Sequence, residues 1–248
     1  MQTATAIVKS LKRGDIELLV LPELAFTGYS VESREEILPF CEEADNGPSV
    51  EWAKTTAVRL AAFVQLGFAE KMVGSDGMHL YNSICFVSPD GTLITTYQKH
   101  FLFTTDESWA SEGSAFKSMF VEGLGMVGFG ICMDLNPYKF QSPFDAFEFG
   151  CFHRDAGSSL LLVSMAWLKQ DDAAMDLSTI QYWANRIAPI VRDVSDDRQV
   201  HVVICNRIGT ERGVTFCGNS CVLRICRNGV RILARLDRVQ VGLLIAET

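Results

Sequence analysis

The 248-residue chain has no run of basic residues. Its 22 lysines and arginines are scattered and outnumbered by 30 aspartates and glutamates, which gives a formal net charge of -8 and a pI near 5.0. A nucleic-acid-binding surface needs clustered lysines and arginines that neutralise phosphates. The composition therefore argues against a nucleic-acid partner and is more compatible with substrates that are neutral or carry an amine.

From the sequence pattern we expect neither a membrane span nor a secretory leader. The longest apolar run, SSLLLVSMAW at 158–167, is roughly half the length that a membrane helix needs. The N-terminal stretch MQTATAIVKSLKRG has a polar, helical pattern without the apolar centre of a signal peptide. These features predict a soluble, cytoplasmic protein.

The eight cysteines do not form a disulfide or metal pattern. Most lie inside apolar, strand-like runs, which is typical of buried reduced thiols: Cys85, Cys132, Cys205, Cys221 and Cys226. Cys217, Cys221 and Cys226 lie along one strand-like segment without a second ligand pair, so we expect no zinc site. We interpret the acidic stretch DDAAMD at 171–176 as a solvated loop rather than a cation site.

Apolar periodicity alternates between strand-like and helix-like segments, without repeats or a linker. With 48% hydrophobic residues, the chain can bury one large core, and we expect a single domain over 1–248. The pattern predicts an α/β layered domain that mixes parallel and antiparallel strands. Helices are expected over 1–12, 49–62, 144–157 and 177–193, and strands over 16–22, 63–70, 82–98 (a hairpin), 116–122, 126–133, 159–167, 200–207, 219–226, 230–236 and 241–247.

Three polar residues directly follow strand-like stretches. Glu23 follows LLVLP, Lys99 follows ITTYQ, and Cys132 follows VGFGI. Sites in α/β proteins are built at such strand ends. Taken singly, Glu23 and Lys99 are also consistent with solvated strand ends, and Cys132 with a packed core thiol. Their joint appearance favours a functional site.

A Glu–Lys–Cys group has a chemical rationale. A thiol with its ordinary pKa of about 8.5 is a poor nucleophile until it loses its proton. A neighbouring carboxylate can take that proton, and an ammonium can lower the thiol pKa and stabilise an oxyanion. Of the four histidines only His100 is near this group, and its ring should point to the opposite face from Lys99. A Cys–His pair is therefore less supported.

Three blocks carry a family resemblance: LPELAFTGY at 21–29, YQKHFL with TTDESWASEG at 97–113, and GFGICMDLNPYKF at 128–140. In order and spacing they resemble the signature blocks of the nitrilase superfamily of carbon–nitrogen hydrolases. The flanking AFEF at 146–149 and SMAW at 164–167 are similar to the fungal branch that deamidates N-terminal asparagine and glutamine of proteins. The resemblance covers nearly the whole chain and implies a four-layer α-β-β-α sandwich.

Carried over by position, the resemblance makes Cys132 the nucleophile, Glu23 the general base and Lys99 the oxyanion stabiliser. The backbone N–H of Met133 would join Lys99 at the oxyanion. The expected cycle passes through a thioester and releases ammonia, and it requires no metal or organic cofactor.

Glu107, eight positions after Lys99, matches a second glutamate that superfamily members use to orient the lysine and substrate. Asp106 and Glu112 compete for this role.

Residues around the nucleophile are candidates for substrate binding. Asp134 could accept the substrate α-ammonium, or it could cap the turn after the strand. Asn136 and Tyr138 could line the pocket or only shape the turn. Trp167 could form an apolar wall or belong to the core, and Tyr29 could border the entrance.

The resemblance implies an amidase that converts N-terminal Asn and Gln to Asp and Glu, a step of the N-degron pathway. A small-molecule amidase of the same superfamily, such as an ω-amidase or a carbamoylase, is the nearest alternative. A carbamoylase would require a basic residue just after the nucleophile, where this chain has Met-Asp-Leu-Asn. A non-catalytic protein that only binds partners is the third alternative.

The resemblance also implies a departure at the N-terminus. Superfamily members usually open with a strand before the first helix, whereas this sequence begins inside that helix. The chain would then be a fragment, a mis-predicted gene start or a shortened variant. We expect it to lack the first strand and to expose a sheet edge beside the Glu23 strand. Superfamily relatives often dimerise, so a homo-oligomer is possible.

Overall fold

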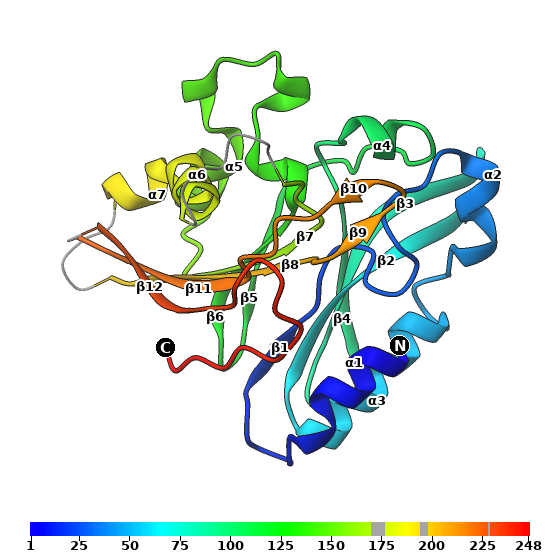
Figure 1. The fold of residues 1–248 in the computed structure, drawn as a ribbon, viewed down its shortest axis with the longest axis horizontal. Coiled ribbons are helices and arrows are strands. Elements are labelled where there is room, and N and C mark those ends of the chain that lie inside the picture. The colour runs from blue at the N-terminus through cyan, green and yellow to red at the C-terminus, as the bar shows by residue number, and fades with distance from the viewer. Residues whose placement is uncertain (170–176, 194–197, 228) are drawn as a thin grey trace.

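The computed structural model describes residues 1–169, 177–193, 198–227 and 229–248. Two β-sheets lie face to face, and helices cover the outer side of each sheet (Figure 1). Apolar side chains from both sheets fill the space between them; the rings of Phe86 and Phe129, for example, have centroids 5.3 Å apart. The predicted α/β class with mixed sheets is confirmed. The acidic stretch 171–176 lies outside the described residues.

The first sheet has the strand order β1-β2-β3-β4 within the described residues. Its strands are β1 (Leu18–Val20), β2 (Phe63–Gly74), β3 (Gly77–Val87) and β4 (Leu93–Gln98). β1 is parallel to β2 because the long connection through α3 (Pro48–Leu60) returns the chain to the same end of the sheet. The β2–β3 and β3–β4 pairs are antiparallel.

The second sheet has the order β12-β11-β8-β7-β6-β5 in the described part of the chain. Its strands are β5 (Lys117–Val121), β6 (Gly125–Ile131), β7 (Leu160–Met165), β8 (Val200–Asn206), β11 (Cys221–Cys226) and β12 (Gly229–Arg235). β6, β7 and β8 are parallel, and the outer pairs are antiparallel. The central β7 reads LLLVSM and is almost wholly buried, as expected for a strand covered on both faces.

Helices pack on the outer faces of both sheets. The helix α1 (Gln2–Ile7) and α3 lie on the first sheet, and α5 (Glu148–Asp155), α6 (Ser178–Arg186) and α7 (Ala188–Asp193) lie on the second (Figure 1). Short elements complete the described chain: α2 (Arg34–Ile37), α4 (Thr104–Glu107), β9 (Thr210–Glu211), β10 (Val214–Thr215) and the 3-10 helices η1 (Val8–Ser10), η2 (Leu38–Phe40), η3 (Cys132–Leu135), η4 (Tyr138–Phe140) and η5 (Phe144–Ala146). Among the described residues, no helix is both long and apolar enough to cross a bilayer.

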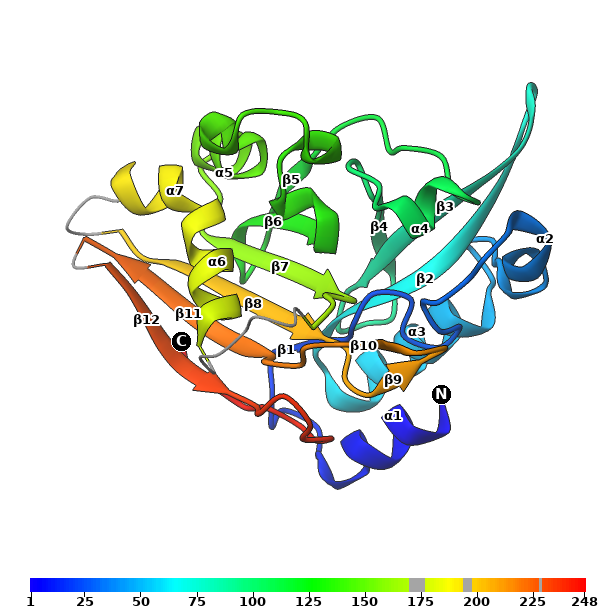
Figure 2. The ribbon, with the colours of Figure 1, turned by 45° about the horizontal axis from the view of Figure 1, so that its top comes forward.

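Several predicted elements differ from the structure. The helix expected over 144–157 is divided at Phe147, whose φ of 46° separates η5 from α5. The single helix expected over 177–193 breaks at Ile187, because Pro189 lacks an N–H and clashes with the preceding turn. The strand expected over 241–247 is wrong, since this segment has no regular structure and Val241 and Ile245 are exposed. β2 and β3 are longer than expected and form a hairpin that projects past the rest of its sheet (Figure 2). β1 pairs only with β2 within the described residues.

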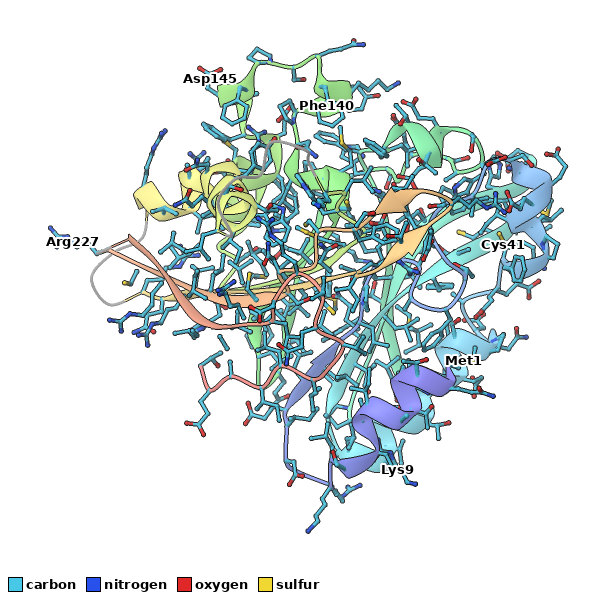
Figure 3. All side chains as sticks on the ribbon, viewed as in Figure 1. Met1, Lys9, Cys41, Phe140, Asp145 and Arg227 are labelled. Atoms are coloured by element: carbon cyan, nitrogen blue, oxygen red, sulfur yellow. The ribbon has the colours of Figure 1, made fainter. Side chains whose placement is uncertain are left out.

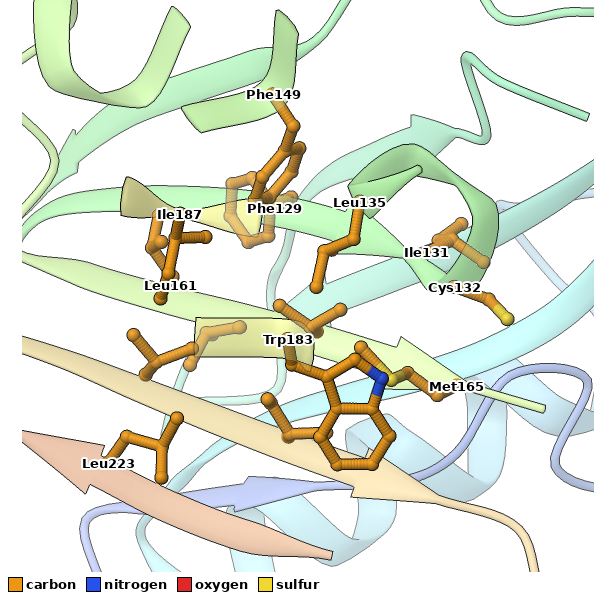
Figure 4. Packing of buried hydrophobic residues seen from close by; sticks show 14 of the residues in the cluster. Phe129, Ile131, Cys132, Leu135, Phe149, Leu161, Met165, Trp183, Ile187 and Leu223 are labelled. Atoms are coloured by element: carbon orange, nitrogen blue, oxygen red, sulfur yellow. The ribbon is translucent and has the colours of Figure 1, made fainter. Parts of the chain in front are cut away.

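Strand ends from both sheets meet at one end of the molecule. Glu23 follows β1, Lys99 follows β4, and Cys132 follows β6 directly. Figure 4 shows Cys132 at the margin of the buried apolar cluster, with its sulfur directed away from that cluster. The segment after η3 leads outward, with Phe140 and Asp145 near its outer end (Figure 3).

Candidate active site

Glu23 and Lys99 form a fully buried ion pair. The Lys99 Nζ lies 2.6 Å from Glu23 Oε1 and 2.6 Å from Asp106 Oδ2, and all three side chains have no exposed surface. Buried charges are costly unless each one is paired. Two carboxyl groups therefore share one ammonium inside the protein.

Asp106, rather than Glu107, occupies the position beside Lys99. Both residues belong to α4, where Asp106 points inward and also accepts the Phe103 backbone N–H at 3.0 Å. Glu107 is exposed, and its charge acts on Lys139 at the surface. The expectation for Glu107 is therefore corrected, because the first turn of α4 directs Asp106 into the interior and leaves Glu107 exposed.

Glu112 is the other residue considered for this place, and it also lies elsewhere. Its carboxylate accepts the Tyr138 hydroxyl at 2.8 Å and lies 3.7 Å from the Lys139 ammonium. Tyr138 therefore bonds to a surface carboxylate, which agrees with the alternative that it shapes the turn.

Each carboxylate oxygen of Glu23 has defined donors. Oε1 accepts from Lys99 Nζ at 2.6 Å and from Asn82 Nδ2 at 2.7 Å, and Oε2 accepts from the backbone N–H of Ala166 at 2.7 Å. Burial raises the pKa of Glu23, and the Asp106 charge adds to this, while Lys99 and Asn82 act in the opposite direction. A carboxyl with a raised pKa is a better proton acceptor.

Lys99 keeps its proton. Burial by itself would lower the pKa of the ammonium, but the charges of Asp106 and Glu23 outweigh burial and hold the pKa above its usual range. Lys99 is thus a fixed positive charge rather than a base.

Cys132 is the first residue after β6 and adopts a strained backbone conformation. Its φ of 41° is in the left-handed region that non-glycine residues rarely adopt, and such strain is concentrated at functional sites. The side chain is 7% exposed. Burial raises the pKa of the thiol well above its ordinary value and Glu23 raises it further, while Lys99 and the Ala166 N–H act the other way. The ammonium therefore does not produce a resting thiolate, so the proton must be removed by a base.

Asp134 supports the chain on both sides of the nucleophile. One oxygen accepts the N–H groups of His100 and Phe101 at 3.1 and 2.8 Å, and the other accepts the Tyr97 hydroxyl and the Ile131 N–H at 2.8 Å each. With no exposed surface and four donors, this carboxylate has no capacity for a substrate ammonium. The geometry agrees with the alternative of a turn cap.

Asn136 and Trp167 are both held by neighbouring residues. The side-chain Oδ1 of Asn136 accepts a hydrogen bond from the Tyr182 hydroxyl at 2.6 Å. Trp167 packs against the Tyr182 ring, with ring centroids 5.6 Å apart. Trp167 is 9% exposed, so part of its surface remains accessible. Met133 is buried in η3, next to Cys132.

Tyr29 is buried against the charged group, with its ring centroid 5.8 Å from the Lys99 Nζ. Its backbone N–H donates to Glu211 at 2.8 Å, and Glu211 pairs with Arg207. The Arg207 guanidinium also donates to the carbonyl oxygens of Glu23 at 3.2 Å and Leu24 at 2.7 Å. Arg207 thus fixes the turn after Glu23, where Leu24 has a φ of 44°.

Asn82, Tyr182 and Arg207 were not predicted from the sequence. Arg207 follows an apolar strand, the same signal that identified Glu23, and could have been found in this way. Asn82 is the first residue of a strand-like run. At such a position the alternation of polar and apolar residues does not show whether the asparagine side chain is exposed to solvent or buried. His100 donates its Nδ1–H to the Gly113 carbonyl oxygen, 2.7 Å away.

Comparisons with known proteins place this site in a family. A family model described as "Carbon-nitrogen hydrolase" matches residues 1–137. The chain is 34% identical over 251 residues to the protein N-terminal amidase of Schizosaccharomyces pombe, a match that covers 94% of this chain and 87% of that protein. Two solved structures of N-terminal amidase show the same fold at 21% sequence identity. The structure with an Asn-Glu-Ala peptide has a TM-score of 0.82, and the match covers 99% of this chain and 92% of that chain. The structure with a Gln-Gly peptide has a TM-score of 0.81, and the match covers 98% of this chain and 91% of that chain. The chain therefore belongs to the carbon–nitrogen hydrolase family of the nitrilase superfamily and is an amidase of that family.

Proposed function

We propose that this amidase removes the side-chain amide nitrogen from N-terminal Asn and Gln of proteins or peptides. The observation that carries the proposal is the buried group at the ends of three strands, in which Glu23 and Lys99 form an ion pair and both act on the Cys132 thiol. The match to a protein N-terminal amidase over most of both chains supports the substrate class. The products are an N-terminal Asp or Glu and ammonia, as in the N-degron pathway.

The first half of the cycle forms a thioester. Glu23 takes the proton of the Cys132 thiol as the sulfur attacks the amide carbon, and the carbonyl electrons move to oxygen. Lys99 and the backbone N–H of Met133 donate to this oxyanion. The carbon–nitrogen bond then breaks, Glu23 passes its proton to nitrogen, and ammonia leaves.

The second half hydrolyses the thioester. Glu23 takes a proton from water, the resulting hydroxide attacks the thioester carbon, and the carbon–sulfur bond breaks. The sulfur recovers the proton from Glu23, and the carboxylic acid leaves. No step requires a cofactor, because the ammonium of Lys99 supplies the positive charge.

Asn136, Trp167 and Tyr29 remain the proposed lining of the substrate pocket. The accessible part of Trp167 and the neighbouring Tyr182 ring form an aromatic wall, and aromatic faces attract ammonium groups. An α-ammonium acceptor of this kind does not require Asp134, whose four donors already occupy it.

Ammonia release from matched substrates tests the proposal. The substrates are peptides that begin with Asn or Gln, their N-acetylated forms, and free glutamine. We expect turnover of the free N-terminal peptides and no turnover after acetylation. Faster release from free glutamine than from the peptides would select a small-molecule amidase, and equal turnover of acetylated peptides would remove the α-amine requirement.

Two cysteine variants serve as controls. Cys132→Ala should abolish ammonia release, and Cys151→Ala, at a half-buried position on α5, should retain it. Full activity of Cys132→Ala would rule out the proposed nucleophile.

A further inference from the structure

Asn82 is buried on β3 between two carboxylates. Its Nδ2 donates to Glu23 Oε1 at 2.7 Å and to Asp106 Oδ1 at 3.0 Å, so both N–H bonds of the amide are used. Lys99 bridges the same two carboxylates at 2.6 Å each. A neutral amide and an ammonium therefore hold Glu23 and Asp106 from two sides.

The amide orientation follows from these contacts. The reverse orientation would direct Oδ1 of Asn82 at two carboxylate oxygens, which is electrostatically unfavourable. In the observed orientation Oδ1 is buried and has no hydrogen-bond partner among the described residues. A buried acceptor without a partner costs free energy of folding. Asn82 thus serves its two acceptors at some cost to stability.

The two oxygens of Glu23 differ in their capacity to take a proton. Oε1 already accepts two hydrogen bonds, from Lys99 and Asn82. Oε2 accepts one, from the Ala166 N–H, and this same N–H faces the Cys132 sulfur. A carboxylate oxygen has two lone-pair positions, so of the two Glu23 oxygens only Oε2 has one free.

We propose that Asn82 is a positioning residue that keeps Oε1 of Glu23 occupied and thereby makes Oε2 the atom that carries the proton. One proton leaves the Cys132 sulfur for Oε2 and passes from there to the departing nitrogen, while Asn82 neither gains nor loses a proton. Asn82 touches no reacting atom and acts through Glu23. This inference rests on the proposed function, in which Glu23 is the general base.

The acid limb of the pH profile reports this role, because Glu23 must be deprotonated to act. The groups that face Glu23 are Lys99, Asp106, Cys132, Tyr29 and, at its backbone carbonyl, Arg207. Among the hydrogen bonds to this carboxyl, the one from Asn82 lowers its pKa. Without that donor the pKa of Glu23 rises, and the acid limb moves to higher pH.

The experiment compares Asn82→Ala and Asn82→Asp with Ser83→Ala. Ser83 is the next residue on β3, is equally buried, and donates to the Glu70 carboxylate at 2.6 Å on the other face, so it is a matched control. The readouts are kcat and KM for an N-terminal Asn peptide against pH, and the pH dependence of Cys132 alkylation by iodoacetamide, followed by peptide mapping. Thermal unfolding confirms that each variant is folded, and Asn82→Asp, which keeps the size of the asparagine side chain, provides a second variant if Asn82→Ala does not fold.

For Asn82→Ala we expect the midpoint of the acid limb in the kcat profile to move to higher pH by roughly one unit, while KM stays nearly unchanged. The lower inflection point of the alkylation profile should move by the same amount. Asn82→Asp, which adds a third carboxylate, should lose about 100-fold in kcat at neutral pH. Ser83→Ala should lower thermal stability and leave both profiles in place. Unshifted profiles in folded Asn82 variants, or an equal shift in Ser83→Ala, would overturn the inference.

Failure of the proposed function gives a different result. If the wild-type protein releases ammonia from none of the peptides, the alkylation profile still decides whether Asn82 controls the proton of Glu23. If the wild type is active and the Asn82 variants keep its profiles, only the positioning role is lost.

Discussion

The Asp106→Asn substitution tests the charged core most directly. It keeps the volume of the side chain and one oxygen, but it removes the carboxylate charge that lies 2.6 Å from Lys99 Nζ. The side chain is fully buried, so water cannot replace the lost interaction. Lys99 retains Glu23 as its partner, so the ammonium stays paired but is held from one side only.

The magnitude follows from the contact that is lost. A hydrogen bond to a charged group contributes roughly 1.5–3 kcal/mol, so we expect the free energy of unfolding to fall by about 2 kcal/mol. For a chain of this size that corresponds to a decrease in Tm of roughly 4–8 °C. The Asp106 charge also raises the pKa of Glu23, so its removal should shift the acid limb of kcat to lower pH, opposite to Asn82→Ala. A less firmly held Lys99 should lower kcat/KM by about 100-fold.

Glu107→Gln is the matched control, one residue away on the same short helix. Because Glu107 is exposed, this variant should keep both the Tm and the kcat/KM of the wild type. Thermal unfolding and ammonia release at several pH values measure both variants. Wild-type activity in Asp106→Asn, or an equal loss in Glu107→Gln, would refute the assignment of Asp106 as the second partner of Lys99.

Three further predictions address the surroundings of the site. Asp134→Asn should lower the free energy of unfolding by about 2–4 kcal/mol, because a carboxylate that accepts four hydrogen bonds is replaced. If the variant instead folds normally and turns over acetylated and free peptides equally, Asp134 is the group that binds the substrate α-ammonium. Arg207→Leu should lower kcat about tenfold, because the hydrogen bond that holds the turn at Leu24 is lost. The control Arg224→Leu on β11 should keep the wild-type kcat. Equal activity of the two variants would exclude a role of Arg207 in positioning Glu23. Burial lowers the pKa of His153 from 6.5 to about 3, so between these pH values the unfolded chain binds a proton that the folded chain does not. The free energy of unfolding should therefore fall as pH decreases from 6.5 toward 3. Denaturant titrations should show a loss of about 2 kcal/mol between pH 7 and pH 5 in the wild type and no such loss in His153→Asn.

Much of the fold was predictable because burial leaves a local pattern. The apolar run that ends at Ile131 is the strand β6, and the alternation around Ser88-Pro89-Asp90-Gly91 is the β3–β4 hairpin. The break at Ile187 was missed because helical periodicity continues across it, although Pro189 was visible. The expected strand over 241–247 has apolar composition, but within the described residues it pairs with no strand.

Local patterns in the sequence were sufficient to identify the residues that could react: a carboxylate, an ammonium and a thiol, each at the end of an apolar strand. Each of these positions is defined by the end of an apolar run in the sequence, so it can be identified without coordinates. The tertiary structure decided which neighbours complete the group. Asp106 instead of Glu107 faces Lys99, Asn82 joins the carboxylates, and Asp134 accepts three backbone N–H groups and the Tyr97 hydroxyl. Adjacent residues in one helical turn differ by about 100° in direction, and only the tertiary contacts of α4, in which Asp106 meets Lys99 and Asn82, select which one is buried.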